Sequence, residues 1–432
     1  MNKLLCLLLV LSFGLSTAQA QRYSKRKIRK DLQELPGFEN AFIGFLLVDP
    51  EKKKPLYEQY ADKYMTPGST TKLFTIYGAI QHLPDTLSAL EYVVQGDSLI
   101  FWSTGYPLNL HPDHPDSAVV NFLNATDKQL FYWPRPTADS RFGPGWGWDD
   151  YPYYFGAEKS VFPIYGNSIR FILDNKNKTY SMSPQYRGFR VTVDSLDAEK
   201  SSVVRDEFWN EFHIQFANNY EVDTITRAFH SSNALFTDLL SDAIQRPIQH
   251  LDLNSRPEYH ESIPGVIADS LYRWTLQESD NLFAEQIMLM ISGQQSDTLS
   301  TEAGIDELQL TWNSSTAPQF PGELIWRDGS GLSRYNMFKP TELQKLISLF
   351  DTNEILGLLP QGQTSGTLED WYGPYVFAKT GTLSNNHALV GYVLTDKGKY
   401  LQFVLIANHY TASTSTVRKS MGVMLEKIKT GF

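Results

Sequence analysis

Ser69 and Lys72 form a pair of side chains whose spacing suits covalent chemistry. Residues i and i+3 are neighbours on one face of a helix, so this hydroxyl and this amine can touch. A serine hydroxyl is a weak nucleophile until a neighbouring base removes its proton. A lysine can serve as that base only when its amine is neutral, and burial lowers the pKa of an amine enough to allow this. The pair therefore predicts a serine nucleophile with a lysine base.

Two later segments could complete such a site. Segment 279–281 reads Ser-Asp-Asn and stands between two stretches of helical pattern. There a second hydroxyl could pass a proton to a leaving amine, and an asparagine amide could hold a substrate carbonyl. Segment 379–382 reads Lys-Thr-Gly-Thr and leads towards a predicted C-terminal hairpin. A lysine and a threonine on a strand could bind a carboxylate, while the glycine would let an extended peptide pair closely with the strand edge.

Each of these short patterns also occurs elsewhere, where a structural explanation is simpler. Segment 24–27 repeats Ser-x-x-Lys in a basic, exposed stretch, and segments 231–233 and 384–386 repeat Ser-x-Asn. A second Lys-Thr-Gly at 429–431 lies one residue from the C-terminus. We interpret these four copies as helix caps, turns or accidents, because short motifs produce false matches. The order and context of the first set distinguish it from the copies.

A Ser-x-x-Lys that opens a helix, a Ser-x-Asn between helices and a Lys-Thr-Gly that enters a hairpin resemble the motifs of penicillin-binding proteins and serine β-lactamases. Further segments are similar to one branch, the class C low-molecular-mass penicillin-binding proteins, which are the D-alanyl-D-alanine carboxypeptidases/endopeptidases of peptidase family S13. These segments are 144–150, 279–285 and 327–334. Members of that family carry a large insertion between the first two motifs, and here 210 positions separate Ser69 from Ser279. The likeness runs from about residue 40 to about residue 410.

The resemblance implies catalytic roles for four of these residues. Ser69 is expected to be acylated, and Lys72 to accept its proton. Ser279 is expected to relay protons to the departing D-alanine, and Asn281 to position the substrate amide. The substrates implied are peptidoglycan stem peptides, with β-lactam antibiotics as covalent inhibitors and with no cofactor.

The resemblance also assigns the third motif. Lys379 and Thr380 are expected to engage the terminal carboxylate of the substrate, and Lys379 is expected to help keep Lys72 neutral. Gly381 is expected to allow close pairing of the substrate with the strand. The backbone N–H groups of Ser69 and Thr382 would form the oxyanion hole.

Three positions match residues that contact the donor side chain in relatives that accept diaminopimelate-containing peptides. These are Asp150, Phe155 and Arg334, which we predict to bind substrate. Each also has a structural interpretation, as a turn cap, a core aromatic residue and an ion-pair partner respectively. A glutamine often follows the third motif in such relatives, whereas Ser384 stands here. The side-chain preference therefore stays open.

Several alternatives compete with a peptidase. A serine β-lactamase would need a deacylating arrangement such as a glutamate with a positioned water, and no such glutamate can be identified in the sequence. A catalytically idle scaffold or antibiotic sensor would not need the complete set of motif residues. An α/β-hydrolase is disfavoured because the sequence has no Gly-x-Ser-x-Gly. His111 and His114 have the spacing of metal ligands, but they lie in a loop of prolines and aspartates, and we assign no metal.

The predicted elements place the motifs in one α+β domain of the penicillin-binding-protein/β-lactamase type, formed by residues 21–90 and 226–432, with a β-rich insertion at 91–225. Strands are predicted at 41–48 and 56–60, and a closing hairpin at 388–394 and 400–407. The helix after Ser69 should bury its apolar stripe, and a final helix should bury another. The stripes are Leu73, Ile76, Tyr77 and Ile80 in the first helix, and Val417, Met421, Met424, Leu425 and Ile428 in the last.

Residues 1–20 read as a cleavable secretory signal, with Lys3, an apolar run too short to span a membrane, and a small-x-small site that ends at Ala20. Cys6, the only cysteine, lies in this segment, so no disulfide is expected. Removal of Lys3 takes the formal charge from −10 to −11, which argues against nucleic acid as a partner. We therefore expect an exported, periplasmic protein without a transmembrane anchor.

Overall fold

The computed structural model describes residues 23–52, 54–196, 198–314, 320 and 323–432. The predicted signal at 1–20, with Cys6, lies outside the described residues. The motif-bearing part is built on a five-stranded antiparallel sheet with the order β14-β15-β16-β1-β2. Its strands are β1 (Phe42–Val48), β2 (Tyr57–Gln59), β14 (Val376–Leu383), β15 (Asn386–Leu394) and β16 (Tyr400–Asn408). The predicted hairpin is therefore confirmed, and it lies next to β1, the first strand of the chain.

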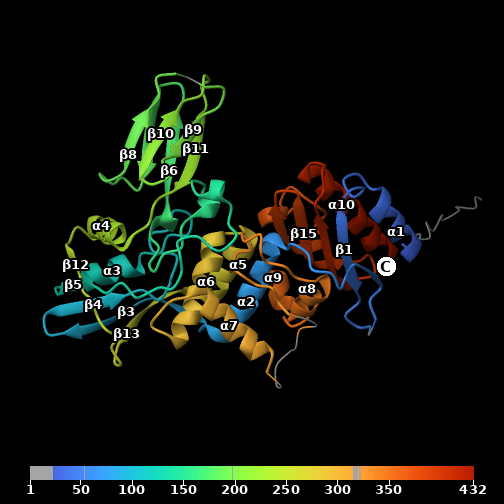
Figure 1. The fold of residues 1–432 in the computed structure, drawn as a ribbon, viewed down its shortest axis with the longest axis horizontal. Coiled ribbons are helices and arrows are strands. Elements are labelled where there is room, and N and C mark those ends of the chain that lie inside the picture. Colours follow the sequence, from blue (N-terminus) through green and yellow to red (C-terminus); the bar gives the residue numbers. More distant parts are fainter. Residues whose placement is uncertain (1–22, 53, 197, 315–319, 321–322) are drawn as a thin grey trace, which may run out of the picture.

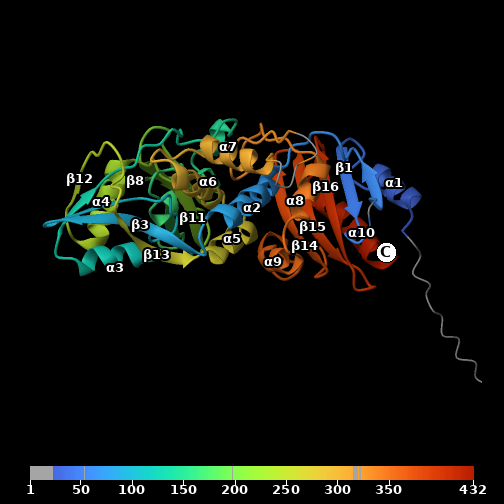
Figure 2. The ribbon, with the colours of Figure 1, turned by 90° about the horizontal axis from the view of Figure 1, so that it is seen from below.

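Helices cover both faces of this sheet (Figures 1 and 2). One face packs against α1 (Lys25–Glu34) and α10 (Thr414–Gly431), whose apolar residues share a buried cluster with those of the strands. All five stripe residues predicted for the last helix are buried in that cluster. The other face packs against α8 (Pro340–Ile347) and the helices around α2.

A group of helices lies between this sheet and the inserted part (Figure 2). It contains α2 (Lys72–His82), α5 (Ala268–Gln277), α6 (Asn281–Gln295), α7 (Thr301–Trp312) and α9 (Thr352–Leu358). Helix α6 is buried from Leu282 to Gly293, so its first turn is fixed deep inside the protein. Leu73, Ile76 and Tyr77 of the predicted α2 stripe are buried, but Ile80 is 40% exposed. The prediction for Ile80 is wrong because the last turn of α2 reaches the surface beside Leu83.

The inserted part contains a second five-stranded sheet with the order β12-β5-β4-β3-β13. Its strands are β3 (Thr86–Gln95), β4 (Ser98–Trp102), β5 (Gln129–Tyr132), β12 (Ile248–His250) and β13 (Glu261–Ile267), and it is accompanied by α3 (Ala118–Ala125) and α4 (Asn233–Ile244). Because β13 returns to pair with β3, this sheet begins before residue 91 and ends well after residue 225. The elements that share the inserted sheets thus run from 86 to 267, a longer span than the 91–225 predicted.

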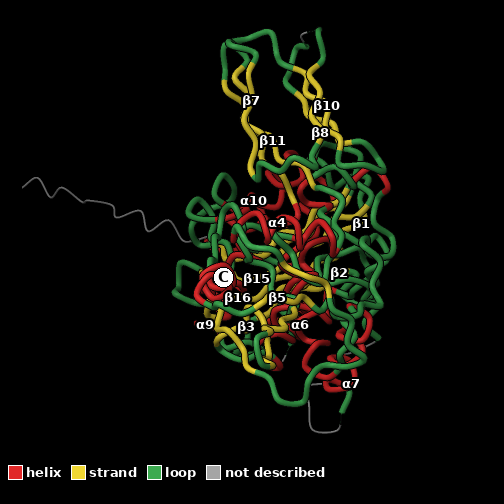
Figure 3. The backbone as a smooth tube through the Cα atoms, turned by 90° about the vertical axis from the view of Figure 1, so that its left-hand side faces the viewer, coloured by secondary structure: helices red, strands yellow, loops and turns green. Residues whose placement is uncertain are grey.

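Two three-stranded sheets project from the body of the molecule (Figures 1 and 3). Their orders are β8-β10-β9 and β11-β6-β7. The strands are β6 (Ser168–Asp174), β7 (Thr179–Ser183), β8 (Arg190–Val193), β9 (Ser202–Arg205), β10 (Glu211–Gln215) and β11 (Val222–Ala228). Short 3₁₀ turns complete the elements: η1 (Gly68–Thr71), η2 (Trp148–Asp150), η3 (Tyr154–Gly156), η4 (Tyr165–Asn167) and η5 (Gly366–Leu368). Within the described ranges, no helix combines the length and the apolar character that crossing a membrane requires.

Candidate active site

Ser69 lies in the 3₁₀ turn η1, which runs directly into α2 at Lys72. The turn and the helix together keep the i, i+3 relation, and Lys72 Nζ lies 3.1 Å from Ser69 Oγ. Gly68 has a φ of +53°, and a Cβ at this position would lie 2.9 Å from the backbone nitrogen of Thr382. A glycine is therefore needed just before Ser69, both for the backbone conformation and for the close approach of β14.

Lys72 is fully buried and touches three oxygens. Besides Ser69 Oγ, its Nζ donates to Asn281 Oδ1 at 2.6 Å and to the Ser330 carbonyl at 2.7 Å. Burial lowers the pKa of Lys72 to about 8, although the charges of nearby carboxylates oppose this shift. A neutral amine has two N–H donors and one lone pair. Because Asn281 and Ser330 accept the two N–H groups, the lone pair is left to face the Ser69 hydroxyl, which is the arrangement a general base needs.

Ser279 and Lys379 form a second hydroxyl–amine pair beside the first. Ser279 joins α5 to α6 with a φ of +60°, a conformation that non-glycine residues seldom adopt. Lys379 Nζ donates to Ser279 Oγ at 2.8 Å and to the Thr380 carbonyl at 3.0 Å. Lys379 is fully buried, and this burial, together with the charge of Lys72, lowers its pKa well below the ordinary value. Its contacts orient Ser279, and the lowered pKa of Lys72 is due chiefly to the burial of Lys72 itself.

The first turn of α6 fixes the amide of Asn281. Asp280 caps this helix by accepting the N–H of Phe283 at 2.8 Å. Asn281 Nδ2 donates to the Phe155 carbonyl at 2.8 Å, while its Oδ1 accepts from Lys72. The asparagine thus links the predicted base to the inserted part of the chain, a contact that the sequence pattern did not predict.

A carboxylate network behind Lys72 was also missed. The Ser330 N–H donates to Glu285 Oε1 at 2.8 Å, which holds the Ser330 carbonyl on Lys72. Glu285 Oε2 is buried and has no hydrogen-bond partner among the residues that the structure describes. Burial, followed by the charge of Asp328, raises the pKa of this glutamate. Asp328 accepts from several groups of its own loop and from Trp146 Nε1 at 2.8 Å. These residues lie in the segments that carry the family resemblance, but their types alone indicated no chemistry.

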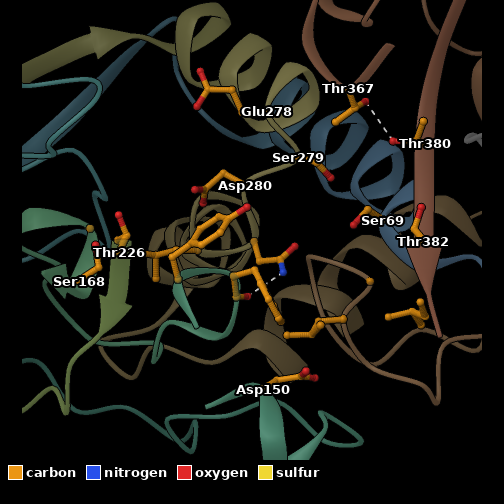
Figure 4. Close-up of a pocket in the computed structure, with 18 of the residues that line it drawn as sticks. Ser69, Asp150, Ser168, Thr226, Glu278, Ser279, Asp280, Thr367, Thr380 and Thr382 are labelled. Atoms are coloured by element: carbon orange, nitrogen blue, oxygen red, sulfur yellow. Dashed lines mark hydrogen bonds between the residues drawn. The ribbon is translucent and has the colours of Figure 1, made fainter. Parts of the chain in front are cut away.

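The third motif lies on β14, the edge strand of the sheet, and faces η1. A Cβ on Gly381 would lie 2.1 Å from the Pro67 carbonyl and 2.9 Å from the Ser69 nitrogen, so only glycine permits this contact. Thr380 Oγ1 donates to Thr367 Oγ1 at 3.0 Å. Figure 4 shows Ser69, Ser279, Thr380 and Thr382 around one cavity.

The cavity has a volume of about 770 Å³ and joins residues far apart in the chain. Its lining includes Asp150, Phe155 and Arg334 as well as residues of all three motifs. Arg334 Nη1 lies 3.4 Å from Asp150 Oδ2, and Phe155 stacks on Tyr153 with ring centroids 5.4 Å apart. The structure therefore brings all eleven predicted site residues to one place, either in the wall of this cavity or, for Lys72, Gly381 and Lys379, directly behind it.

The additional motif copies have structural contacts of their own, although Ser384, in the copy at 384–386, lines the cavity. Ser24 caps α1 and Ser232 caps α4 through their side chains, as we predicted for such copies. Asn385 has a φ of +62° in the turn between β14 and β15, and Lys429 pairs with Asp396. These contacts account for the copies without any catalytic function.

His111 and His114 line or border the insertion side of the cavity. His114 Nε2 lies 2.8 Å from Glu278 Oε1, and its ring stacks on Trp274. His111 Nδ1 faces backbone N–H groups, and burial lowers its pKa to about 4. Across the described ranges, no group of three or more His, Cys, Asp or Glu side chains is arranged to hold a metal ion.

Comparison with known proteins places this geometry in a family. A family model described as the D-Ala-D-Ala carboxypeptidase 3 (S13) family matches residues 24–97 and 135–428. The D-alanyl-D-alanine carboxypeptidase DacB of Haemophilus influenzae is 22% identical over 465 residues, which cover 94% of this chain and 91% of that protein. A penicillin-sensitive carboxypeptidase A of Dictyostelium discoideum is 29% identical over 168 residues, 34% of this chain and 31% of that protein.

A solved structure shows the same fold. The crystal structure of penicillin-binding protein 4 (dacB) from Haemophilus influenzae superposes with a TM-score of 0.75 at 19% identity, and the match covers 93% of this chain and 99% of that one. The predicted α+β fold of the penicillin-binding type is therefore confirmed. Because the family model matches most of the sequence, the chain belongs to the S13 family of serine D-Ala-D-Ala carboxypeptidases.

Proposed function

We propose that this protein cleaves the D-alanyl-D-alanine bond of peptidoglycan stem peptides through an acyl-enzyme on Ser69, and that β-lactams acylate the same serine. The observation that carries the proposal is the contact between a buried Lys72, with a pKa lowered to about 8, and Ser69 Oγ. The Haemophilus influenzae relative has been solved in complex with a β-lactam, which supports the second part.

The mechanism of acylation follows from the positions of four side chains, those of Ser69, Lys72, Ser279 and Lys379. Lys72 takes the Ser69 proton, and Oγ attacks the carbonyl carbon of the penultimate D-alanine. The backbone N–H groups of Ser69 and Thr382 stabilise the oxyanion, because both lie where η1 meets β14. The C–N bond then breaks, and the proton that Lys72 took from Ser69 passes through the hydroxyl of Ser279, which Lys379 orients, to the departing amine. In the second step water attacks the ester carbonyl and gives one proton to Lys72, which returns it to Ser69 Oγ as the acyl–oxygen bond breaks.

Rapid hydrolysis of a β-lactam would require a general base that is free to activate water, such as a carboxylate. Among the described residues, four carboxylates line the cavity: Asp113, Asp150, Glu278 and Asp280. Each has a partner, respectively Arg170, Arg334, His114 and the N–H of Phe283. We therefore favour a peptidase, whose acyl-enzyme with a β-lactam is hydrolysed slowly. A β-lactamase would hydrolyse it rapidly.

The substrate and the reaction can be tested together on purified peptidoglycan. The protein is incubated with the polymer and the products are separated by mass. Free D-alanine and shortened stem peptides indicate carboxypeptidase activity, whereas loss of cross-linked dimers indicates endopeptidase activity. We expect both, because the two reactions share the scissile bond. An unchanged product profile would contradict the proposal.

Asp150→Ala is expected to lower kcat/KM about tenfold for peptides whose third residue has a free side-chain amine. The reason is the position of the Asp150 carboxylate in the cavity wall, where it can pair with a cationic amine. Peptides without that amine should be cleaved at nearly the wild-type rate, and Asp149→Ala, which changes an exposed neighbour, serves as the control. Equal losses on both kinds of peptide would refute the assignment.

Glu285→Gln is expected to move the pH dependence of kcat/KM to lower pH. In the wild type, the charge of Glu285 raises the pKa of Lys72, so its removal should make the lysine neutral at lower pH. The matched control is Glu342→Gln, which changes another buried glutamate that contacts Lys339 rather than Lys72. A profile that moves to higher pH, or moves equally in both variants, would contradict the proposed role of Lys72 as the base.

We also propose export of the protein to the periplasm, on the basis of the leader-like residues 1–20. N-terminal sequencing of the protein from the periplasmic fraction of an expressing bacterium should give a chain that starts after Ala20. Recovery of the uncut chain in the cytoplasm alone would contradict this localisation.

A further inference from the structure

The third motif does not supply an accessible cation for the substrate's terminal carboxylate. Lys379 is fully buried behind the cavity wall, its Nζ contacts Ser279 and the Thr380 carbonyl, and its pKa is lowered. The amine of Lys379 therefore orients the Ser279 hydroxyl and does not reach a ligand in the cavity. A carboxylate entering the cavity therefore needs another positive partner.

Three arginines line the cavity in the part of the chain that the structure describes, and two of them already have carboxylate partners. Arg170 Nη2 contacts both oxygens of Asp113 at 2.7 Å. Arg334 pairs with Asp150. Arg418, in the second turn of α10, borders the cavity together with Thr382 and Ser384.

Arg418 is the cavity arginine that has no ion-pair partner among the described residues. Its guanidinium lies over the ring of Trp371, 5.0 Å from the ring centroid, and its Nε is buried with no hydrogen-bond partner in the described part of the chain. A partly buried guanidinium left without an acceptor is unfavourable, and its planar fork of N–H groups matches a carboxylate. Stacking on Trp371 would hold that fork in place before a ligand binds.

A buried histidine prepares the hydroxyl next to Arg418. His387 Nδ1 lies 2.8 Å from Thr382 Oγ1, and no described residue forms a hydrogen bond with its buried Nε2. Burial, reinforced by the charges of Arg418 and Lys379, lowers the pKa of His387 to about 3, so the ring is neutral. A buried N–H without an acceptor costs more than a bare ring nitrogen, which favours the proton on Nδ1. His387 then donates to Thr382, and the Thr382 hydroxyl is free to donate into the cavity.

We infer that Arg418, together with the Thr382 hydroxyl that His387 orients, binds the carboxylate on the amine-bearing carbon of the leaving group. This inference rests on the proposed function. It identifies the leaving groups that the enzyme accepts: an amino acid whose amine and carboxylate share one carbon, whether it is a terminal D-alanine or the acceptor residue of a cross-link. Arg418 is thus a specificity-determining residue for the reaction.

The test compares two peptides that differ only at the C-terminus, one ending in D-Ala-D-Ala and one ending in D-Ala-D-alaninamide. For wild type we expect kcat/KM to be at least about tenfold higher with the free carboxylate. Arg418→Gln should lower kcat/KM for the acid about 10- to 100-fold and change that for the amide less than about threefold. Arg418→Lys should fall between the two, and Lys419→Gln, on the exposed side of the same turn, should behave as wild type.

The possible failures are distinguishable. If wild type cleaves neither peptide nor any other D-Ala-D-Ala substrate, the proposed function fails. If wild type prefers the acid and Arg418→Gln keeps that preference, or loses activity equally on both peptides, this inference fails while the function stands. A wild-type enzyme without any preference would overturn the inference even if the variants do not fold.

Discussion

Replacement of Ser69 by alanine is expected to abolish release of D-alanine, with a fall in kcat of at least about 10³-fold. Alanine removes the only atom that can form the ester with the substrate. The cavity and the turn η1 should persist, because the close backbone approaches at Gly68 and Gly381, which join η1 to β14, are unchanged in this variant. The measurement is D-alanine released from a D-Ala-D-Ala peptide under saturating conditions.

The sequence offers a matched control for this variant. Ser24 stands in the other Ser-x-x-Lys pattern and caps α1. Ser24→Ala should lower stability by about 1 kcal/mol, as the loss of a helix cap does, and leave the turnover rate unchanged. Retention of activity in Ser69→Ala, or an equal loss in Ser24→Ala, would contradict the assignment of the nucleophile.

Replacement of Lys72 is expected to have the second largest effect, a fall in kcat/KM of about 10³-fold. Lys72→Met keeps the unbranched chain apart from its terminal amine and so removes the base, whereas Lys72→Arg keeps a charge that cannot be removed near neutral pH. In the wild type, kcat/KM should rise with pH through about 8, because the amine acts as a base only after it loses its proton and burial lowers its pKa to that value.

Both Lys72 variants are compared with Lys27→Arg, which changes the lysine of the other pattern, in the first turn of α1. Lys27→Arg should leave both the rate and the pH profile unchanged. A Lys72→Met enzyme that stays within tenfold of wild type, or a wild-type rate that falls as the pH rises through 8, would show that another group removes the Ser69 proton.

Much of the site could be predicted because its motifs lie on helices and strands whose positions follow from the local sequence pattern. The apolar periodicity of 414–431 and the turn at 397–398 fix α10 and the β15–β16 hairpin within a few residues. The motif residues follow from their types: a serine and a lysine one helical turn apart, and a glycine where β14 meets η1. Here local pattern and tertiary contact agree.

Most of the residues that were missed act through contacts with distant parts of the chain. Glu285 contacts Lys72 through the backbone of Ser330. His387 is closer in sequence, because it lies opposite Thr382 in the β14–β15 hairpin, but its residue type alone indicated no role. Arg418 belongs to a helix whose pattern predicted only a buried face. The sheet of the inserted part extends beyond residue 225 because β13 pairs with β3, more than 160 positions away, and no local signal encodes such a pairing.

The most direct test of the account is mass spectrometry of the protein after incubation with benzylpenicillin, followed by mapping of the modified peptide. We predict one covalent adduct per chain, located on the peptide that contains Ser69 and absent from Ser69→Ala. An adduct on another residue, or one that persists in Ser69→Ala, would contradict the central claim that the Lys72 amine activates the Ser69 hydroxyl.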